Sequence, residues 1–111
     1  MELELSTSRD GEICVVHVTG EVDVYTSPSL KVALADATGD GCRVIIADLG
    51  KVPFIDSSGL GVLVGALRRV REAGGELRLV SEHEAVVKIL RITGLDRVFP
   101  LYATLDQAMG A

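Results

Sequence analysis

A carboxylate and two hydroxyl side chains are adjacent in the run Asp56-Ser57-Ser58-Gly59-Leu60-Gly61, and a hydroxyl can accept a phosphate. A helical periodicity starts here, so the serines are expected in the first turn of a helix. The backbone N–H groups of a first turn lack helical partners, and the helix dipole favours negative charge there. Ser57 is therefore a candidate phosphate acceptor. From the residues alone, the alternative is that Asp56 or Ser57 merely caps the helix.

Three glycines fall inside the same expected helix, at Gly59, Gly61 and Gly65. Each glycine costs roughly 1 kcal/mol relative to alanine in a helix interior, so something must compensate for them. Small residues could let this helix pack closely on a sheet, or the segment could serve a functional site. The pattern is compatible with both explanations.

The remaining hydrophobic pattern predicts a hairpin followed by alternating helices and strands. The expected strands are a first one around Leu3 and Leu5, then Ile13–Val18, Val44–Ala47, Leu77–Val80 and a short one at Val98–Phe99. Four helices are expected. The first has Ser27 as its N-cap and ends at Gly39, and the second runs from Ser57 to Ala73. The third follows a capping box at Ser81 and Glu84, and the fourth follows another at Thr104 and Gln107. Two consecutive β-α-β units result. They predict one α/β domain over residues 1–111, with a mixed sheet of four to five strands, central parallel strands and about four flanking helices.

Polar residues follow three of these strands at their carboxyl ends. Glu21 and Asp23 follow the second strand, the run at 56–58 follows the third, and Ser81 and His83 follow the fourth. Because the carboxyl ends of parallel strands meet at one edge of a sheet, these side chains are expected to share that edge. The topology thus predicts a site there.

An enzyme is the alternative from another functional class. Ser57, His83 and Asp23 are expected on one edge, and a serine nucleophile needs a base that an acid orients. A serine hydrolase using Ser57 and His83 is less favoured, because the chain lacks a Gly-x-Ser-x-Gly elbow and His83 falls in a helical first turn. His17 is expected to be a half-exposed sheet residue and no ligand, and Phe54, Phe99 and Met109 are expected in the core.

Composition and charge restrict the partners. The 111 residues are 48% apolar and carry a net charge of -5, which argues against nucleic acid or an anionic membrane as partner. The acidic N-terminus does not resemble a signal peptide, and no apolar stretch approaches the roughly 18 residues of a membrane span. Cys14 and Cys42 lack metal-site spacing and are expected as reduced thiols. We therefore expect a cytoplasmic protein, monomeric when free, with no metal or cofactor and no nucleotide-binding loop.

At these residues the sequence resembles the anti-sigma factor antagonists, bacterial STAS domain proteins that release a sigma factor by binding its anti-sigma kinase. The resemblance covers nearly the whole chain and rests on Gly20-Glu21-Val22-Asp23, Phe54-Ile55-Asp56-Ser57-Ser58-Gly59-Leu60-Gly61, Gly74-Gly75 and Gly94-Leu95. In that family the serine after the aspartate accepts the phosphate, which corresponds to Ser57. The acidic residue of the Gly-Glu-x-Asp segment corresponds to Asp23, at the edge where the kinase docks. The resemblance implies a partner-binding surface of Glu21, Asp23, Asp56, Ser57, Ser58 and Gly59.

The resemblance also implies a switch that is a substrate and not an enzyme. The unphosphorylated form would bind the anti-sigma factor kinase, phosphorylation of Ser57 by that kinase would end binding, and a phosphatase would restore it. A phosphate adds about -1.5 to -2 charges beside Asp56 and near Asp23, which should alter the interface more than the fold. A STAS subunit of a stressosome or lipid-transport complex is the alternative within the family, less favoured because the Asp-Ser-Ser-Gly sequence is intact. Tyr25 matches no motif, so the identity of the kinase stays open.

Overall fold

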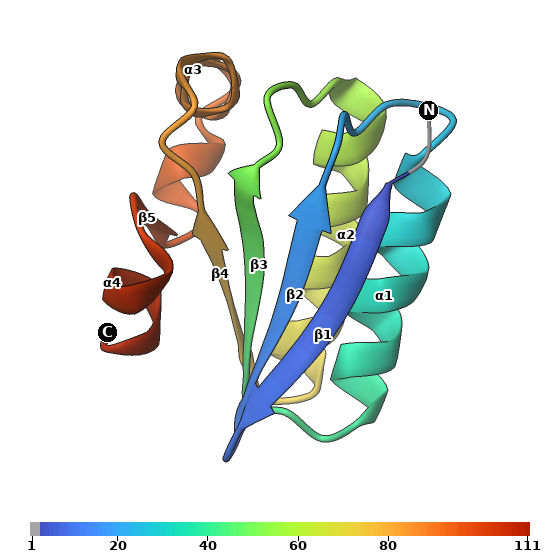
Figure 1. Cartoon of the computed structure of the whole chain (residues 1–111). Coiled ribbons are helices and arrows are strands. Elements are labelled where there is room, and N and C mark those ends of the chain that lie inside the picture. The colour runs from blue at the N-terminus through green and yellow to red at the C-terminus, as the bar shows by residue number, and fades with distance from the viewer. Residues whose placement is uncertain (1–2) are drawn as a thin grey trace.

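A single mixed sheet forms the middle of the molecule, with helices on both of its faces (Figure 1). The computed structural model describes residues 3–111. The strands are β1 (Glu4–Asp10), β2 (Ile13–Thr19), β3 (Val44–Lys51), β4 (Glu76–Val80) and β5 (Leu101–Tyr102), in that spatial order. Only the β1–β2 pair is antiparallel; the other neighbouring strands are parallel. The predicted α/β fold, with a hairpin and central β-α-β units, is confirmed.

The helices divide between the two faces of the sheet. They are α1 (Ser27–Gly39), α2 (Ser57–Glu72), α3 (Glu84–Ile92) and the short α4 (Leu105–Met109), with a 3₁₀ turn at Leu95–Arg97. Alternate residues of β3 point to opposite sides: Ile45 and Ala47 belong to the large core with α1, α2 and α3, while Ile46 packs with Ala108 of α4. This coverage on both faces explains why the first half of β3, Val44–Ala47, is uniformly apolar.

The fifth strand lies three residues later than the sequence predicts. After Gly94, in the left-handed conformation at φ 75°, the chain forms the 3₁₀ turn, and Phe99 N–H donates to the Leu95 carbonyl. Phe99 is thereby turned into the core, where it is buried as expected. The prediction of a strand at Val98–Phe99 is wrong because β-propensity there reflects burial and not pairing.

Two expected helix starts are also wrong by one or two residues. Thr26, not Ser27, is the N-cap of α1, and His83, not Ser81, is that of α3. Ser81 Oγ accepts from the His83 N–H, so the serine stabilises the turn before the helix. The cap at Thr104 is confirmed, because its hydroxyl accepts from the Gln107 N–H.

Two predictions about individual side chains are corrected. Cys14 and Cys42, expected as free thiols, are joined in a disulfide, with Cα atoms 5.8 Å apart. The parallel pairing of β2 with β3 brings them together, a contact that sequence spacing does not reveal. Phe54, expected in the core, is 47% exposed in the loop before α2.

Candidate functional site

The start of α2 resolves which residue caps this helix. Asp56 Oδ1 accepts from the N–H groups of Ser58 (2.9 Å) and Gly59 (3.1 Å), so Asp56 is the N-cap. Ser57 is exposed, and its hydroxyl makes no hydrogen bond within residues 3–111. The capping function thus belongs to the aspartate, which leaves the serine hydroxyl free to react or to contact a partner.

The loop between β2 and α1 is ordered by a second aspartate. Asp23 Oδ1 accepts from the N–H groups of Tyr25 (2.9 Å) and Thr26 (3.0 Å). The Thr26 hydroxyl donates to the Glu21 carbonyl (2.8 Å) and accepts from the Asp23 N–H. The Thr26 N–H is the main cause that lowers the pKa of the Asp23 carboxyl below its ordinary value. Asp23 therefore carries a fixed negative charge at neutral pH.

These two loops are joined by backbone pairing at the carboxyl edge of the sheet (Figure 1). Val22 N–H donates to the Phe54 carbonyl (3.0 Å), and Asp56 N–H donates to the Val22 carbonyl (3.1 Å). Val22 and Ile55 form an isolated parallel bridge. The sequence prediction that the Asp23 and Ser57 segments share one edge is therefore confirmed.

Gly59 explains why a glycine is needed in the first turn of α2. A Cβ atom here would lie 2.5 Å from Ile55 Cγ1 and 2.6 Å from Val22 Cγ1. The absence of a side chain lets α2 approach the paired loops, as the packing explanation requires. At Gly61 the same explanation fails, because an added Cβ would meet no atom within 4 Å.

The segment after β4, which carries Ser81 and His83, makes its contacts away from Ser57. His83 Nε2 lies 3.0 Å from the carbonyl oxygen of Gly50, at the end of β3, and Ser81 is buried. Within residues 3–111, no hydrogen bond joins Ser57 to His83 or to Asp23. The geometry thus gives Ser57 no base, and the arrangement required of a serine hydrolase is missing at this edge.

Exposed apolar side chains lie on the two paired loops that precede α1 and α2, and sequence reasoning did not assign them to the site. Val24 and Tyr25 lie in the loop before α1, where Tyr25 is 87% exposed. Phe54 lies in the loop before α2, and its carbonyl accepts the hydrogen bond from the Val22 N–H that joins the two loops. The available signal was an aromatic residue in a loop outside any apolar periodicity. Exposed aromatic residues on ordered loops are typical of protein-binding surfaces.

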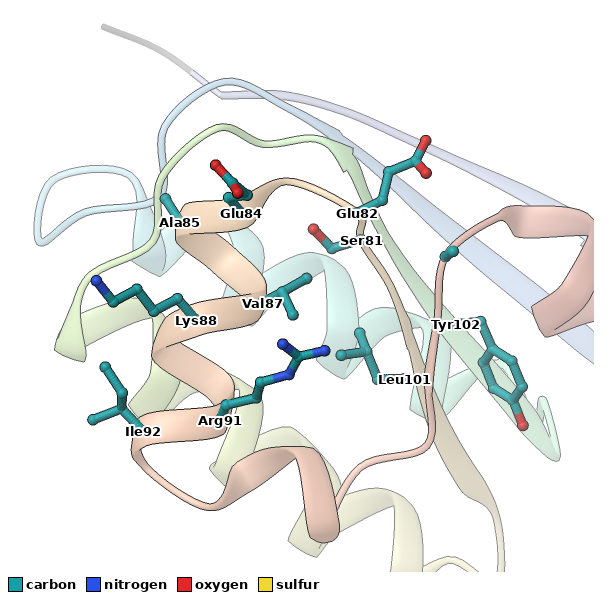
Figure 2. A pocket seen from close by; sticks show the side chains of 11 residues that line it. Ser81, Glu82, Glu84, Ala85, Val87, Lys88, Arg91, Ile92, Leu101 and Tyr102 are labelled. Carbon is teal, nitrogen blue, oxygen red and sulfur yellow. The ribbon is translucent and has the colours of Figure 1, made fainter.

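A separate hollow of about 940 Å³ lies between α3 and β5 (Figure 2). Lys88 and Arg91 project from α3, and Leu101 lies on the β5 side. Of the residues that the sequence placed on the carboxyl edge, it includes Ser81 but not Asp23, Asp56 or Ser57. This hollow is therefore not part of the Ser57 surface.

Comparison with known proteins gives a consistent family relationship. The STAS domain model matches residues 4–108. The anti-sigma-B factor antagonist of Staphylococcus aureus (strain NCTC 8325 / PS 47) is 36% identical over 95 residues, which cover 86% of this chain and 88% of that relative.

Solved structures agree with the sequence comparison. An anti-sigma factor antagonist from Mycobacterium paratuberculosis has a TM-score of 0.90 and 31% identity, over 97% of this chain and 92% of the other. The anti-sigma factor antagonist SpoIIAA in its unphosphorylated form has a TM-score of 0.79 and 25% identity, over 96% of this chain and 92% of the other.

Proposed function

The chain belongs to the STAS domain family, and from this premise we propose that it is an anti-sigma factor antagonist switched off by phosphorylation of Ser57. The unphosphorylated protein binds an anti-sigma factor kinase, and that binding frees a sigma factor. The kinase transfers phosphate to Ser57, and a phosphatase reverses the transfer. The anti-sigma factor antagonists among its relatives support the general role.

The observation that carries the proposal is the free hydroxyl of Ser57 beside a completed helix cap. A phosphoacceptor must reach the active site of another protein. Its hydroxyl must therefore be exposed and must not be held in a hydrogen bond that stabilises the fold. Ser57 meets both conditions, because Asp56 already binds the first-turn N–H groups of Ser58 and Gly59. The structure of the relative SpoIIAA is of its unphosphorylated form, which is in keeping with a phosphate switch.

The same geometry predicts what a phosphate does. It adds about -1.5 to -2 charges at neutral pH. Two of the N–H groups that would stabilise it are already bound to Asp56, so the helix terminus offers less compensation than an uncapped one. The phosphate therefore projects towards the partner on the sheet edge that carries Asp23 and Asp56. A surface matched to a neutral serine then meets a dianion, and binding weakens.

The docking surface combines an acidic edge with an apolar flank. Glu21, Asp23 and Asp56 supply the acidic groups, and Ser58 and Gly59 lie in the same first turn as Ser57. Tyr25 and Phe54 add exposed aromatic area on the same two paired loops. We take this surface to bind the kinase, with the free antagonist a monomer in the cytoplasm and neither nucleic acid nor a membrane as a partner. No helix within residues 3–111 is long and apolar enough to span a bilayer.

Phosphate transfer tests this function. Each anti-sigma factor kinase of the source bacterium is purified and incubated with the protein and ATP, and the phosphate is located by mass spectrometry. The matched variants are Ser57→Ala and Ser58→Ala, adjacent serines in the same helical turn. We expect transfer to the wild type and to Ser58→Ala, and none to Ser57→Ala. Transfer that persists unchanged in Ser57→Ala, or no transfer from any kinase, would contradict the proposal.

A further inference from the structure

A serine, a histidine and an aspartate are linked in series on the sheet face opposite α1 and α2. Ser8 Oγ of β1 lies 3.0 Å from His17 Nε2 of β2, and His17 Nδ1 lies 3.1 Å from Asp48 Oδ2 of β3. Three adjacent strands thus supply a hydroxyl, an imidazole and a carboxylate in the order that an activated serine requires.

The hydrogen bonds of Asp48 decide the roles of the two imidazole nitrogens. Asp48 Oδ1 accepts from the Gly50 N–H (3.0 Å), which fixes the carboxylate and turns Oδ2 towards His17. An ionised carboxylate only accepts, so the hydrogen of a neutral imidazole lies on Nδ1. His17 Nε2 is then unprotonated, and Ser8 donates its hydroxyl hydrogen to it. This is the arrangement of nucleophile, general base and orienting acid.

The network is accessible to a small reagent. Ser8 is exposed, and the side chains of His17 and Asp48 are 34% and 21% exposed. The short α4 packs on Val15, Ile46 and Val80 of this same face. Val15 and Ile46 lie two residues before His17 and Asp48 in their strands, and Val80 is the register partner of Asp48. A hollow of about 450 Å³ beside His17 and Asp48 also includes Ser6, Lys51 and Glu4.

We propose that Ser8 is a histidine-activated nucleophile that accepts an acyl group from small activated esters or thioesters. Ser8 Oγ attacks the acyl carbonyl carbon while its proton passes to His17 Nε2. The bond from that carbon to the leaving oxygen or sulfur breaks, the leaving group departs with the electron pair, and His17 later gives the proton to it or to water. The product is an O-acylated Ser8, on a face of the protein separate from Ser57. This activity does not depend on the proposed phosphate switch.

Ser6 provides an internal reference for the test. It lies on β1 directly opposite His17 in the strand register and is exposed, but the imidazole hydrogen-bonds to Ser8 instead. The full chain is treated with p-nitrophenyl acetate near neutral pH, and the tryptic peptide that ends at Arg9 is fragmented to compare acetylation of the two serines. General-base assistance is typically worth a factor of about 100 or more, so we expect Ser8 to be acetylated at least about tenfold faster than Ser6.

Two variants show whether the network causes the difference. His17→Gln should bring the Ser8 to Ser6 ratio to about one, with an unchanged circular dichroism spectrum. In Asp48→Asn the amide oxygen keeps the Gly50 N–H and the amide nitrogen faces His17 Nδ1, which moves the imidazole hydrogen to Nε2. The ratio should then fall, and ¹⁵N NMR of the imidazole should report the changed tautomer. Equal acetylation of the serines in the wild type, no acetylation of either, or a ratio unaffected by His17→Gln would overturn the proposal.

Discussion

At the level of single residues, two adjacent side chains at the start of α2 have different functions, one as the helix cap and one as the proposed phosphate acceptor. Asp56 binds the N–H groups of the first turn, and Ser57 keeps an exposed hydroxyl. The sequence predicted both tasks at this position but not their assignment, because aspartate and serine are about equally good N-caps. Backbone geometry decides: Asp56 has extended φ and ψ angles, as an N-cap requires, and Ser57 is already helical.

Asp23 gives a pH-dependent prediction at the same scale. Its folded-state pKa is lowered, chiefly by the Thr26 N–H, so its contribution to the free energy of unfolding is present above its ordinary pKa and is lost as pH falls through the folded value. Asp23→Asn should therefore destabilise the protein at pH 7, and the difference from wild type should shrink in acid. Urea unfolding at pH 7 and at about pH 3 measures both differences.

Glu21→Gln is the control for Asp23. The Glu21 side chain is exposed and accepts no hydrogen bond within residues 3–111, so this substitution should change the free energy of unfolding little at either pH. A destabilisation by Asp23→Asn that is the same in acid as at neutral pH would show that the carboxylate charge is not responsible.

At the level of secondary structure elements, the order of strands and helices was predicted well, because hydrophobic periodicity governs that order. The buried β3 and the amphipathic α2 lie where their patterns placed them. Features that depend on long-range contacts were missed or misplaced. The apolar side chain of Phe54 suggested burial although its loop lies outside any apolar periodicity, and the Cys14–Cys42 contact depends on the pairing of β2 with β3. Within the candidate site, sequence therefore predicts Asp23 and Ser57 better than the aromatic residues around them.

The close approach of α2 to the paired loops predicts opposite effects at two glycines of one helix. Gly59→Ala should lower the free energy of unfolding by about 1 to 3 kcal/mol, because its Cβ collides with the buried side chains of Val22 and Ile55. Gly61→Ala should raise it by roughly 0.5 to 1 kcal/mol, because its Cβ enters open space in a helix. Chemical denaturation of the two variants measures both values. A similar change in the two would contradict the packing at Gly59.

At the scale of the whole molecule, the parallel strands gather an acidic and partly apolar surface at one end. The backbone bonds between Val22, Phe54 and Asp56 hold the two loops together, so Tyr25 and Ser57 belong to one ordered surface. A typical interface buries about 800 Å² on each partner. A kinase positioned on Ser57 is therefore expected to cover these neighbouring loops as well.

Tyr25 is expected to be an energetic anchor for that kinase. Tyr25 is 87% exposed on a loop already fixed by Asp23, so its ring would be buried at little conformational cost. Tyr25→Ala should weaken kinase binding at least about tenfold, while the stability of the free protein changes by no more than about 0.5 kcal/mol. Isothermal titration calorimetry measures the affinity.

Ile92→Ala is the matched control, since Ile92 is also a large exposed apolar residue, 70% exposed, but lies at the end of α3. It should leave kinase affinity unchanged. Equal losses in both variants would point to a general effect of surface hydrophobicity, and no loss in Tyr25→Ala would remove Tyr25 from the interface.

One phosphate on Ser57 should end partner binding without changing the fold. The direct test is to prepare the protein with phosphoserine at position 57 and to compare its affinity for the anti-sigma factor kinase with that of the unmodified protein, after NMR spectra have shown the same fold for both. We predict that phosphorylation weakens binding by at least about tenfold, because the dianion is added beside Asp23 and Asp56. Equal affinity of the two forms would contradict the claim.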